Sequence, residues 1–462
     1  MLQKTYDTFK PYIPSWVNAD ELIRSFEQPS PTSIRINPNK IKKSLNATRV
    51  PWSEYGYYLN SRPKFTLDPI FHAGGYYVQE ASSMCIESII RPLCSRPLKV
   101  LDVCAAPGGK STHIISLLER GSLLISNETI RSRAHILSEN MIKWGKSNCI
   151  ITNNDPKDFN FLPGFFDVIL VDAPCSGEGM FRKNPHALSE WSPEHITLCS
   201  KRQTRILHDI WDCLAPNGIL IYSTCTFNEQ ENEDVLYEFT KQKAAESIPI
   251  TVNPQWNIIP HTKHTIYSYR FFPHTIMGEG FSMSVLRKTD GVEYTPPKKL
   301  PKSPITIINE RNKLQYSQLI KNYKSIVFES KPNILWAFAK DYRKLLIDVY
   351  AHCNVIHAGI PLVEIIGHKL NPLPGLALAN SYNNTILTHI EVDLETALRY
   401  FKKEALVLKD APKGWVQINY KQIPLGFVKN IGNRANNPYP ASWSIKMDIQ
   451  KEDMWSISDF FS

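Results

Sequence analysis

Five short apolar runs, separated by segments long enough for a helix, dominate the middle of this chain. They are Lys99–Val103, Leu123–Asn127, Cys149–Thr152, Asp167–Asp172 and Gly218–Tyr222. This alternation is typical of parallel strands that are joined by helices. It predicts an α/β domain of Rossmann type, with a mostly parallel, doubly wound sheet. A later run, Met283–Arg287, predicts an edge strand.

The rest of the sequence divides where its composition changes. Near the start, Ser33–Lys43 is basic and alternates polar with apolar residues, which predicts a strand in a small accessory RNA-binding domain. Val292–Lys302 combines prolines with lysines, as linkers do. After this linker, helix and strand signals are mixed. The expected divisions are 1–70, 71–290, a linker over 291–314, an intermediate α+β domain over 315–390, and 391–462.

Composition indicates a soluble protein with reduced cysteines. The chain has 462 residues, of which 42% are hydrophobic, so disorder is not the expected state. Its nine cysteines form no Cys-x-x-Cys pair and no grouping with histidines, which argues against a metal site. A signal peptide and a run of about 18 apolar residues are both missing, so we expect a cytoplasmic location without membrane contact. The net charge of +9 favours an anionic partner such as nucleic acid.

The first apolar run leads into a loop of small residues, Cys104-Ala105-Ala106-Pro107-Gly108-Gly109-Lys110. Such a loop allows a bound nucleotide to approach the backbone closely. Its end is similar to a P-loop, but Cys104 stands where the leading glycine belongs and Pro107 lacks a backbone donor. The Gly-x-Gly-x-x-Gly pattern of nicotinamide enzymes is also absent. Both classes are therefore weaker interpretations than another nucleoside cofactor.

Acidic residues follow the later runs where a nucleoside would need them. Glu128 comes directly after the second run and is placed to accept hydrogen bonds from ribose hydroxyls. Asp155 follows the third run and is expected to face adenine, and Asp172 ends the fourth. Ligands of open α/β sheets bind at this carboxyl edge. Each acid alone is more often a solvated loop residue, but together they predict a nucleoside cofactor.

Two of the strand ends also present a cysteine. Cys175 follows the fourth run and Cys225 follows the fifth, so both thiols are expected to face one pocket. Cysteine is the natural nucleophile for covalent chemistry on a base. In the alternative interpretation each is a packing residue, as many free cysteines are. Methylation of an exocyclic amine is disfavoured, because Ala173–Cys175 lacks the stacking aromatic residue that this reaction uses.

Three stretches together resemble the Nop/Sun-type RNA cytosine-5 methyltransferases, namely Leu101–Lys110, Asp172–Gly179 and Ser223–Thr226. Further matching stretches are Tyr76–Ser83, Glu229–Glu233, Arg270–His274 and Gly278–Gly280. The resemblance implies a class I methyltransferase with a seven-stranded sheet. It also implies S-adenosylmethionine as the cofactor.

The same resemblance implies roles for individual residues. Cys225 is expected to add to C6 of cytosine, and Cys175 to assist release of the product. Asp172 is expected to hold the base near N3, while Lys110 holds Asp172 or favours the thiolate. The residues expected to bind the cofactor are Cys104, Ala105, Ala106, Pro107, Gly108, Gly109, Lys110, Glu128, Asp155 and Asp172.

Stretches near the C-terminus are similar to the bacterial ribosomal-RNA subgroup, the RsmF-like enzymes, which end in a PUA-like RNA-binding domain. They are Ala358–Leu362, Leu376–Ala379 and Pro424–Asn433. This similarity implies that a monomer methylates 16S ribosomal RNA, free or in the assembled subunit, and that DNA is not a substrate. Two alternatives remain open: methylation of transfer RNA, and a non-catalytic RNA-binding factor for ribosome assembly.

Basic and aromatic residues are candidates for RNA contact, since RNA is recognised through phosphates and stacked bases. The basic candidates are Arg35, Lys40, Lys42, Lys43, Arg182, Lys183, Lys429 and Arg434. The aromatic candidates are Phe181, Trp191, Trp415, Tyr420 and Trp443, of which only Phe181 is expected near the site. A solvated basic face or a packed core is the alternative for each.

Overall fold

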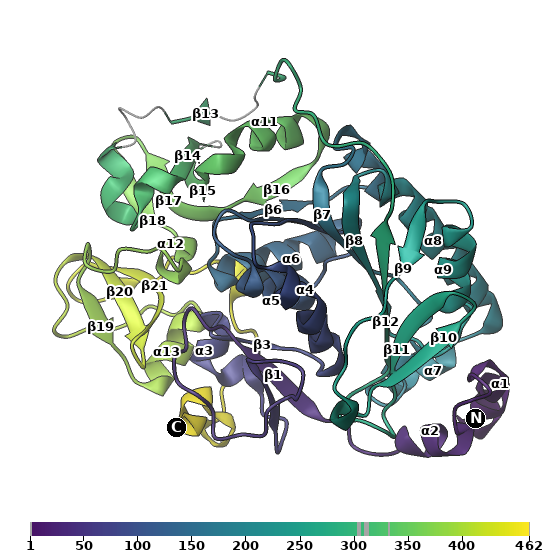
Figure 1. Ribbon diagram of the computed structural model, residues 1–462. Helices are drawn as coiled ribbons and strands as arrows, with labels where there is room; N and C mark the ends of the chain where they lie inside the picture. Colours follow the sequence, from purple (N-terminus) through teal and green to yellow (C-terminus); the bar gives the residue numbers. More distant parts are fainter. Residues whose placement is uncertain (1, 303–305, 309–313, 331–332, 462) are drawn as a thin grey trace.

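A ten-stranded sheet forms the centre of the computed structural model, which describes residues 2–302, 306–308, 314–330 and 333–461 (Figure 1). Its order is β10-β11-β12-β8-β7-β4-β5-β6-β16, with β9 paired to β12. The parallel strands are β4 (Lys99–Asp102), β5 (Leu123–Asn127), β6 (Cys149–Thr152), β7 (Phe166–Asp172) and β8 (Leu214–Thr224). These strands coincide with the five apolar runs. The Rossmann-like α/β fold is therefore confirmed.

Both faces of this sheet are covered by helices, so its parallel strands are apolar on both sides. Val100 shares one hydrophobic cluster with residues of three helices, whereas the next residue, Leu101, shares another cluster with helices on the opposite face. The first face is covered by α4 (Glu87–Leu93), α5 (Gly109–Leu117) and α6 (Arg131–Trp144). The second is covered by α8 (Pro193–Trp211), α9 (Glu233–Thr240) and α11 (Arg343–His352).

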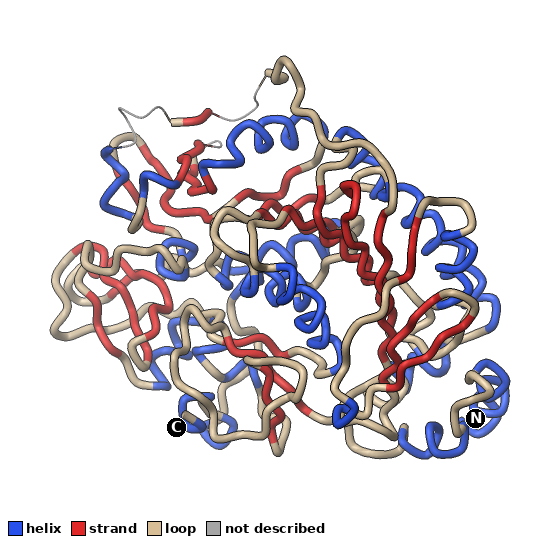
Figure 2. The backbone as a smooth tube through the Cα atoms, in the orientation of Figure 1, coloured by secondary structure: helices blue, strands red, loops and turns tan. Residues whose placement is uncertain are grey.

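Antiparallel strands extend the sheet at both edges. Figure 2 shows the strands in red. On one side they are β12 (Phe281–Lys288), β11 (Ile266–Phe271), β10 (Ile259–Lys263) and β9 (Ala245–Ser247), and on the other β16 (Val355–Ala358). The prediction that Met283–Arg287 is an edge strand is wrong, because β12 lies between β8 and β11. The expected seven strands, β6-β5-β4-β7-β8-β12-β11, are present and are extended by three more.

The N-terminal part has a small sheet of its own, in the order β2-β1-β3. Its strands are β1 (Thr32–Ile36), β2 (Gly56–Leu59) and β3 (Tyr76–Val78), and its helices are α1 (Leu2–Phe9), α2 (Ala19–Ser25) and α3 (Pro69–His72). The strand predicted within Ser33–Lys43 is thus observed as β1. Because β3 faces the loop that precedes α5, this sheet forms one wall of the pocket described below.

The C-terminal part contains two further sheets. The first comprises β13 (Thr306–Ile307), β14 (Ile326–Ser330), β15 (Ile334–Ala339), β17 (Ile360–Ile366) and β18 (Lys369–Pro372), beside α12 (Pro374–Leu378). The second comprises β19 (His389–Glu391), β20 (Gly414–Tyr420), β21 (Ile423–Asn430) and β22 (Ala435–Asn436), beside α13 (Leu394–Phe401). Part of the expected linker, 291–314, lies outside the described residues.

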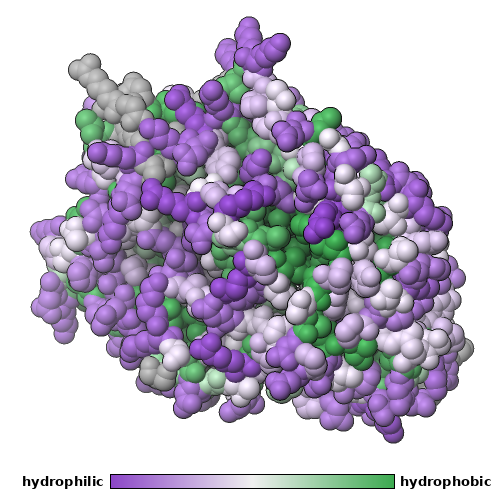
Figure 3. Space-filling model, in the orientation of Figure 1, coloured by the Kyte–Doolittle hydropathy of each residue, from purple (hydrophilic) through white to green (hydrophobic). Residues whose placement is uncertain are grey.

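The N-terminal sheet, β1 to β3, packs against the C-terminal part of the chain, at the lower left of Figure 1. Side chains of the N-terminal sheet share one hydrophobic cluster with α13, β20, β21 and the final residues. The face turned to the viewer is mostly hydrophilic, with apolar side chains gathered near its middle (Figure 3). Among the described residues, no helix is both long and apolar enough to cross a membrane.

Candidate active site

The loop of small residues is held between the first strand and the helices that follow it. It leaves β4 after Asp102 and enters α5 at Gly109, with Gly108 at a positive φ of 111° that favours glycine. From α6, Arg133 donates to the carbonyl of Ala106 at 2.8 Å, and Asn140 donates to that of Pro107 at 2.8 Å. These bonds fix the loop at the carboxyl edge of the sheet.

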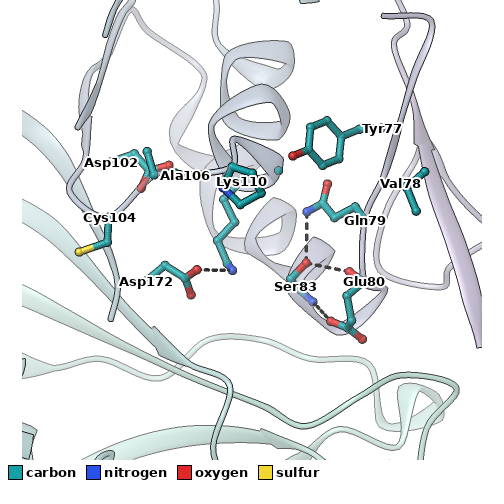
Figure 4. Close-up of a pocket in the computed structure, with 13 residues that line it drawn as sticks. Tyr77, Val78, Gln79, Glu80, Ser83, Asp102, Cys104, Ala106, Lys110 and Asp172 are labelled. Atoms are coloured by element: carbon teal, nitrogen blue, oxygen red, sulfur yellow. Dashed lines mark hydrogen bonds and ion pairs between the residues drawn. The ribbon is translucent and has the colours of Figure 1, made fainter. Parts of the chain in front are cut away.

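A cavity of about 150 Å³ lies against this loop (Figure 4). Seven of the residues predicted to bind the cofactor line it: Cys104, Ala105, Ala106, Pro107, Gly109, Lys110 and Asp172. Gly108, Glu128 and Asp155 do not line it. Glu128 is buried, accepts from the backbone N–H of Ile130 at 3.0 Å and lies 3.3 Å from Arg133. Asp155 instead forms an ion pair of 3.0 Å with Arg205.

The opposite wall of the cavity comes from residues that were not assigned to it from the sequence. These are Tyr77, Val78, Gln79, Glu80 and Ser83, on or just after β3. Gln79 donates to Ser83 at 3.2 Å and accepts from Arg35 at 2.8 Å. The stretch Tyr76–Ser83 carried a family signal, but its position opposite the loop depends on how the N-terminal sheet packs.

Asp102 is a further lining residue that was missed. Its side chain is fully buried, and burial raises its pKa to about 7, although Ser111 donates to Oδ2 at 2.6 Å. The other oxygen, Oδ1, has no hydrogen-bond partner among the described residues. A buried carboxylate oxygen without a partner is costly, so this atom fits a ligand that brings a donor or a cation.

Lys110 and Asp172 form an ion pair at the mouth of the cavity. The Nζ of Lys110 lies 2.8 Å from Oδ2 of Asp172, and Ser223 donates to Oδ1 at 2.7 Å. Burial disfavours the Lys110 ammonium, but the neighbouring carboxylate outweighs this effect and raises the pKa of Lys110. Lys110 therefore stays charged, and Asp172 is held in a fixed orientation.

The two cysteines meet because β7 and β8 are neighbours and end at the same edge. Their Sγ atoms are 3.1 Å apart, and the backbone N–H of Cys225 donates to the sulfur of Cys175 at 3.3 Å. The hydrogen bond with Cys225, together with burial, raises the pKa of Cys175 well above its ordinary value. Cys175 is thus a neutral thiol near pH 7, able to donate its S–H to the sulfur of Cys225.

Several residues expected to contact RNA are buried instead. The side chain of Arg35 lies inside the molecule and donates to Thr112, while Lys40 is half-buried and donates to the carbonyl of Ala73. Arg182 is buried against Glu279. The expectations for Arg35 and Arg182 were wrong, because long cations can bury their stems when their donors find partners; the expectation for Lys40 stays a prediction. Lys42, Lys43, Lys183, Lys429 and Arg434 are exposed.

The aromatic residue expected near the site, Phe181, is not free to stack on a base. It is 4% exposed and packs edge to face against Phe9 and Phe26 of the N-terminal helices. Trp191 is also buried, and its indole N–H donates to Glu178 at 3.1 Å. These rings join the N-terminal helices to the segment that follows Cys175.

Comparison with known proteins agrees with this architecture in all three parts. The profile described as "16S rRNA methyltransferase RsmB/F" matches residues 95–287, that of the N-terminal domain of RsmF matches 6–81, and that of the RsmF PUA domain matches 387–445. The ribosomal RNA small subunit methyltransferase F of Serratia proteamaculans is 31% identical over 453 residues, which cover 93% of each chain. The chain belongs to the RsmF family. The family's PUA-like domain is thereby confirmed.

Other relatives agree with this assignment. The enzyme of the same description from Enterobacter sp. is 30% identical, over 93% of this chain and 92% of the other. A crystal structure of a methyltransferase homologue from Pyrococcus horikoshii superposes with a TM-score of 0.51 at 27% identity, covering 62% of this chain and 99% of that one. This RsmF-family protein is an RNA methyltransferase that uses S-adenosylmethionine, and the cavity beside Asp102 and the small-residue loop fits that cofactor.

Proposed function

We propose that this protein methylates C5 of cytosine in the RNA of the small ribosomal subunit, through a covalent bond between Cys225 and C6. The observation that carries the proposal is the 3.1 Å contact between Cys175 and Cys225, beside the ion pair of Lys110 and Asp172. A packing role for the cysteines explains neither their meeting at the carboxyl edge nor the charged pair next to them.

The reaction requires a nucleophile on the protein, because C5 of cytosine is unreactive until the ring is activated. The Cys225 thiolate adds to C6 and pushes an electron pair toward C5. N3 takes up a proton from water as the adduct forms and returns it on release; while protonated, N3 donates a hydrogen bond to Asp172, which Lys110 keeps oriented. Bound S-adenosylmethionine supplies the sulfonium methyl group that C5 takes up. Loss of the C5 proton to water then re-forms the C5–C6 double bond and expels the Cys225 thiolate.

Cys175 acts in the release of the product. Because its pKa is raised, it remains a thiol, and its S–H stabilises the negative sulfur of Cys225 as that atom leaves C6. In this assignment one cysteine forms the bond and the other helps to break it.

The proposed substrate rests on the similar proteins and on the need for C5 and C6 of the cytosine to be exposed. The similar curated proteins are described as methyltransferases of the small ribosomal subunit. C5 and C6 are covered in a stacked helix, so the target cytosine must be unpaired or flipped out of its stack. We propose that a monomer acts on an exposed cytosine of 16S ribosomal RNA, either free or in the assembled subunit.

Trapping of the covalent intermediate tests this proposal. Cys175→Ala is incubated with S-adenosylmethionine and with unmodified small-subunit RNA, free and assembled, and the products are separated on a denaturing gel. We expect a protein–RNA complex that disappears in the double variant Cys175→Ala/Cys225→Ala. Sequencing of the trapped RNA identifies the cytosine, and a transfer RNA in the complex would contradict the ribosomal substrate.

Two other results would contradict the mechanism. Persistence of the complex without Cys225 would overturn its role as the nucleophile. Binding of S-adenosylmethionine by the wild type, without methyl transfer to free or assembled RNA, would instead favour a non-catalytic assembly factor.

A further inference from the structure

One buried carboxylate joins the two loops that carry the cysteines. Glu231 lies just before α9, which begins at Glu233, and it is fully buried. Its Oε2 accepts from the backbone N–H of Ser176 at 2.9 Å and from Gln203 at 2.9 Å. Its Oε1 accepts from the hydroxyl of Ser176 and from the side-chain amide of Asn228 at 2.8 Å.

These partners flank the cysteines in the sequence. Ser176 directly follows Cys175, and Asn228 stands three residues after Cys225. The hydroxyl of Ser176 also lies 3.0 Å from that of Thr226, the residue after Cys225. One side chain therefore holds both loops, through hydrogen bonds that are not part of the ladder between β7 and β8.

The buried charge of Glu231 costs free energy of folding. Every hydrogen bond that Glu231 accepts in the described structure comes from a neutral group, so its charge is buried without an ion-pair partner. Burial raises the pKa of Glu231, while the bonds from Ser176 and Asn228 oppose this change. Two of the donors, Ser176 and Asn228, stand in the loops that carry the cysteines, so this buried carboxylate holds those loops together.

We infer that Glu231 is a positioning residue, which sets the separation and orientation of Cys175 and Cys225 by holding Ser176 and Asn228 on one carboxylate. The inference rests on the proposed cysteine mechanism and deepens it. After the hydrogen bond to Cys225, burial and the charge of Cys225, the charge of Glu231 also contributes to raising the pKa of Cys175. Glu231 thereby helps to keep the releasing cysteine in its thiol form.

Glu231→Gln is the informative variant because it keeps the length of the side chain. Its amide oxygen can still accept from Ser176 N–H and Gln203, but its NH2 group then meets the NH2 of Asn228. Asn228 cannot simply turn over, because its Oδ1 already accepts from the backbone N–H of Glu231 at 2.9 Å. Ser176→Ala is a second variant that removes the hydroxyl contacts to Glu231, Thr226 and Asn228 and keeps the carboxylate.

Glu87→Gln provides the matched control. Glu87 is also buried, in α4, and accepts from Ser53 at 2.8 Å and from His113 at 3.0 Å, away from the cysteine loops. Glu87 also accepts from Arg91 at 3.1 Å, an ion pair that Glu231 lacks in the described structure, so the control tests the loss of a buried carboxylate as such, without touching Ser176 or Asn228. Thermal unfolding and S-adenosylmethionine affinity are measured for all variants, so that rates are compared among folded, cofactor-binding protein.

The measurement is single-turnover methyl transfer to unmodified small-subunit RNA, with the covalent complex followed on denaturing gels. We expect Glu231→Gln and Ser176→Ala to release product about 10- to 100-fold more slowly than the wild type and to accumulate complex, with unchanged cofactor affinity. Equal release by Glu231→Gln and Glu87→Gln, without accumulation, would overturn the inference. A complex that survives Cys225→Ala contradicts the nucleophile assignment instead, so the two failures are distinguishable.

Discussion

Asp102 shows how one residue can connect the pocket to the solution pH. It is buried at the end of β4, one of its oxygens lacks a partner in the described structure, and its pKa is raised to about 7. In the free protein it is therefore mostly protonated at pH 6 and mostly ionised at pH 8. Because S-adenosylmethionine carries positive charge, the ionised form is the one expected to bind it more tightly.

Cofactor affinity should accordingly depend on pH through Asp102. We expect the dissociation constant of S-adenosylmethionine to fall up to about tenfold as the pH rises from 6 to 8, and to level off above this range. Asp102→Asn should bind more weakly at pH 8 and lose most of this dependence. Isothermal titration calorimetry at several pH values checks the prediction, and parallel curves for the two proteins would contradict it.

Residues with local motifs were predictable, and those that act through packing were not. Lys110, Cys175 and Cys225 stand in short motifs at strand ends, so their meeting follows from the parallel sheet. Glu231 and Gln79 reach the site through contacts between segments far apart in the sequence. Arg35 and Phe181 were misjudged for the same reason, since their burial depends on those contacts.

At the scale of loops, the segment that carries Cys175, just after β7, is positioned by close backbone packing. A Cβ on Gly179 would overlap the carbonyl oxygen of Gly280, and one on Gly280 would overlap the ring of Phe227. The backbone N–H of Gly179 also donates to the carbonyl of Cys225 at 2.9 Å. The loop after Cys175 is thus pressed between β8 and the loop before β12.

Gly179→Ala should therefore disturb the site more than the fold. We expect a loss of about 1 to 3 kcal/mol in the free energy of unfolding and at least a hundredfold loss in methylation rate, because the backbone must shift. Gly177→Ala, in the same loop, is the control. Its φ is 75°, but a Cβ there meets nothing within 4 Å, so only a strain of about 1 kcal/mol is expected. Equal rates for the two variants would contradict the packing argument.

Elements with a strong apolar pattern were predicted, whereas those made by tertiary pairing were not. The strands β4 to β8 follow buried runs of Val, Ile and Leu. In contrast, β10 reads Ile-Pro-His-Thr-Lys and forms because it pairs with β11. Strand β16 lies more than 200 residues from β6 in sequence, and its antiparallel addition leaves no local signal.

Across the whole molecule, one buried acid, Asp68, joins the N-terminal domain to the C-terminal segment. Oδ2 of Asp68 accepts from the backbone N–H of Ile457 at 3.0 Å, and Oδ1 accepts from Ile70 at 3.0 Å and Ser456 at 3.3 Å. Asp68 and Ile457 are separated by 389 positions. This tie holds the PUA-like domain against the N-terminal sheet, whose β3 lines the cofactor cavity.

The tie should make stability depend on pH. Burial raises the pKa of Asp68 to about 7, so between about pH 4 and pH 7 the unfolded chain ionises while the folded protein keeps its proton. The free energy of unfolding should therefore decrease as the pH rises through this window, by roughly 1.4 kcal/mol per unit at most, and the contribution should be constant above pH 7. Asp68→Asn, which resembles the protonated acid, should lose this slope.

Denaturant unfolding from pH 5 to pH 8 measures the effect as the difference between the wild type and Asp68→Asn. Asp453→Asn is the control, because Asp453 also joins the C-terminal segment to the N-terminal part, through an ion pair of 2.5 Å with the exposed Lys64. Such a pair at the surface contributes little to the free energy of unfolding, about 0 to 1 kcal/mol. The variant Asp453→Asn should therefore leave the pH slope unchanged. A slope that persists in Asp68→Asn would show that other groups dominate the titration and that the chain ends are held mainly by their shared apolar core.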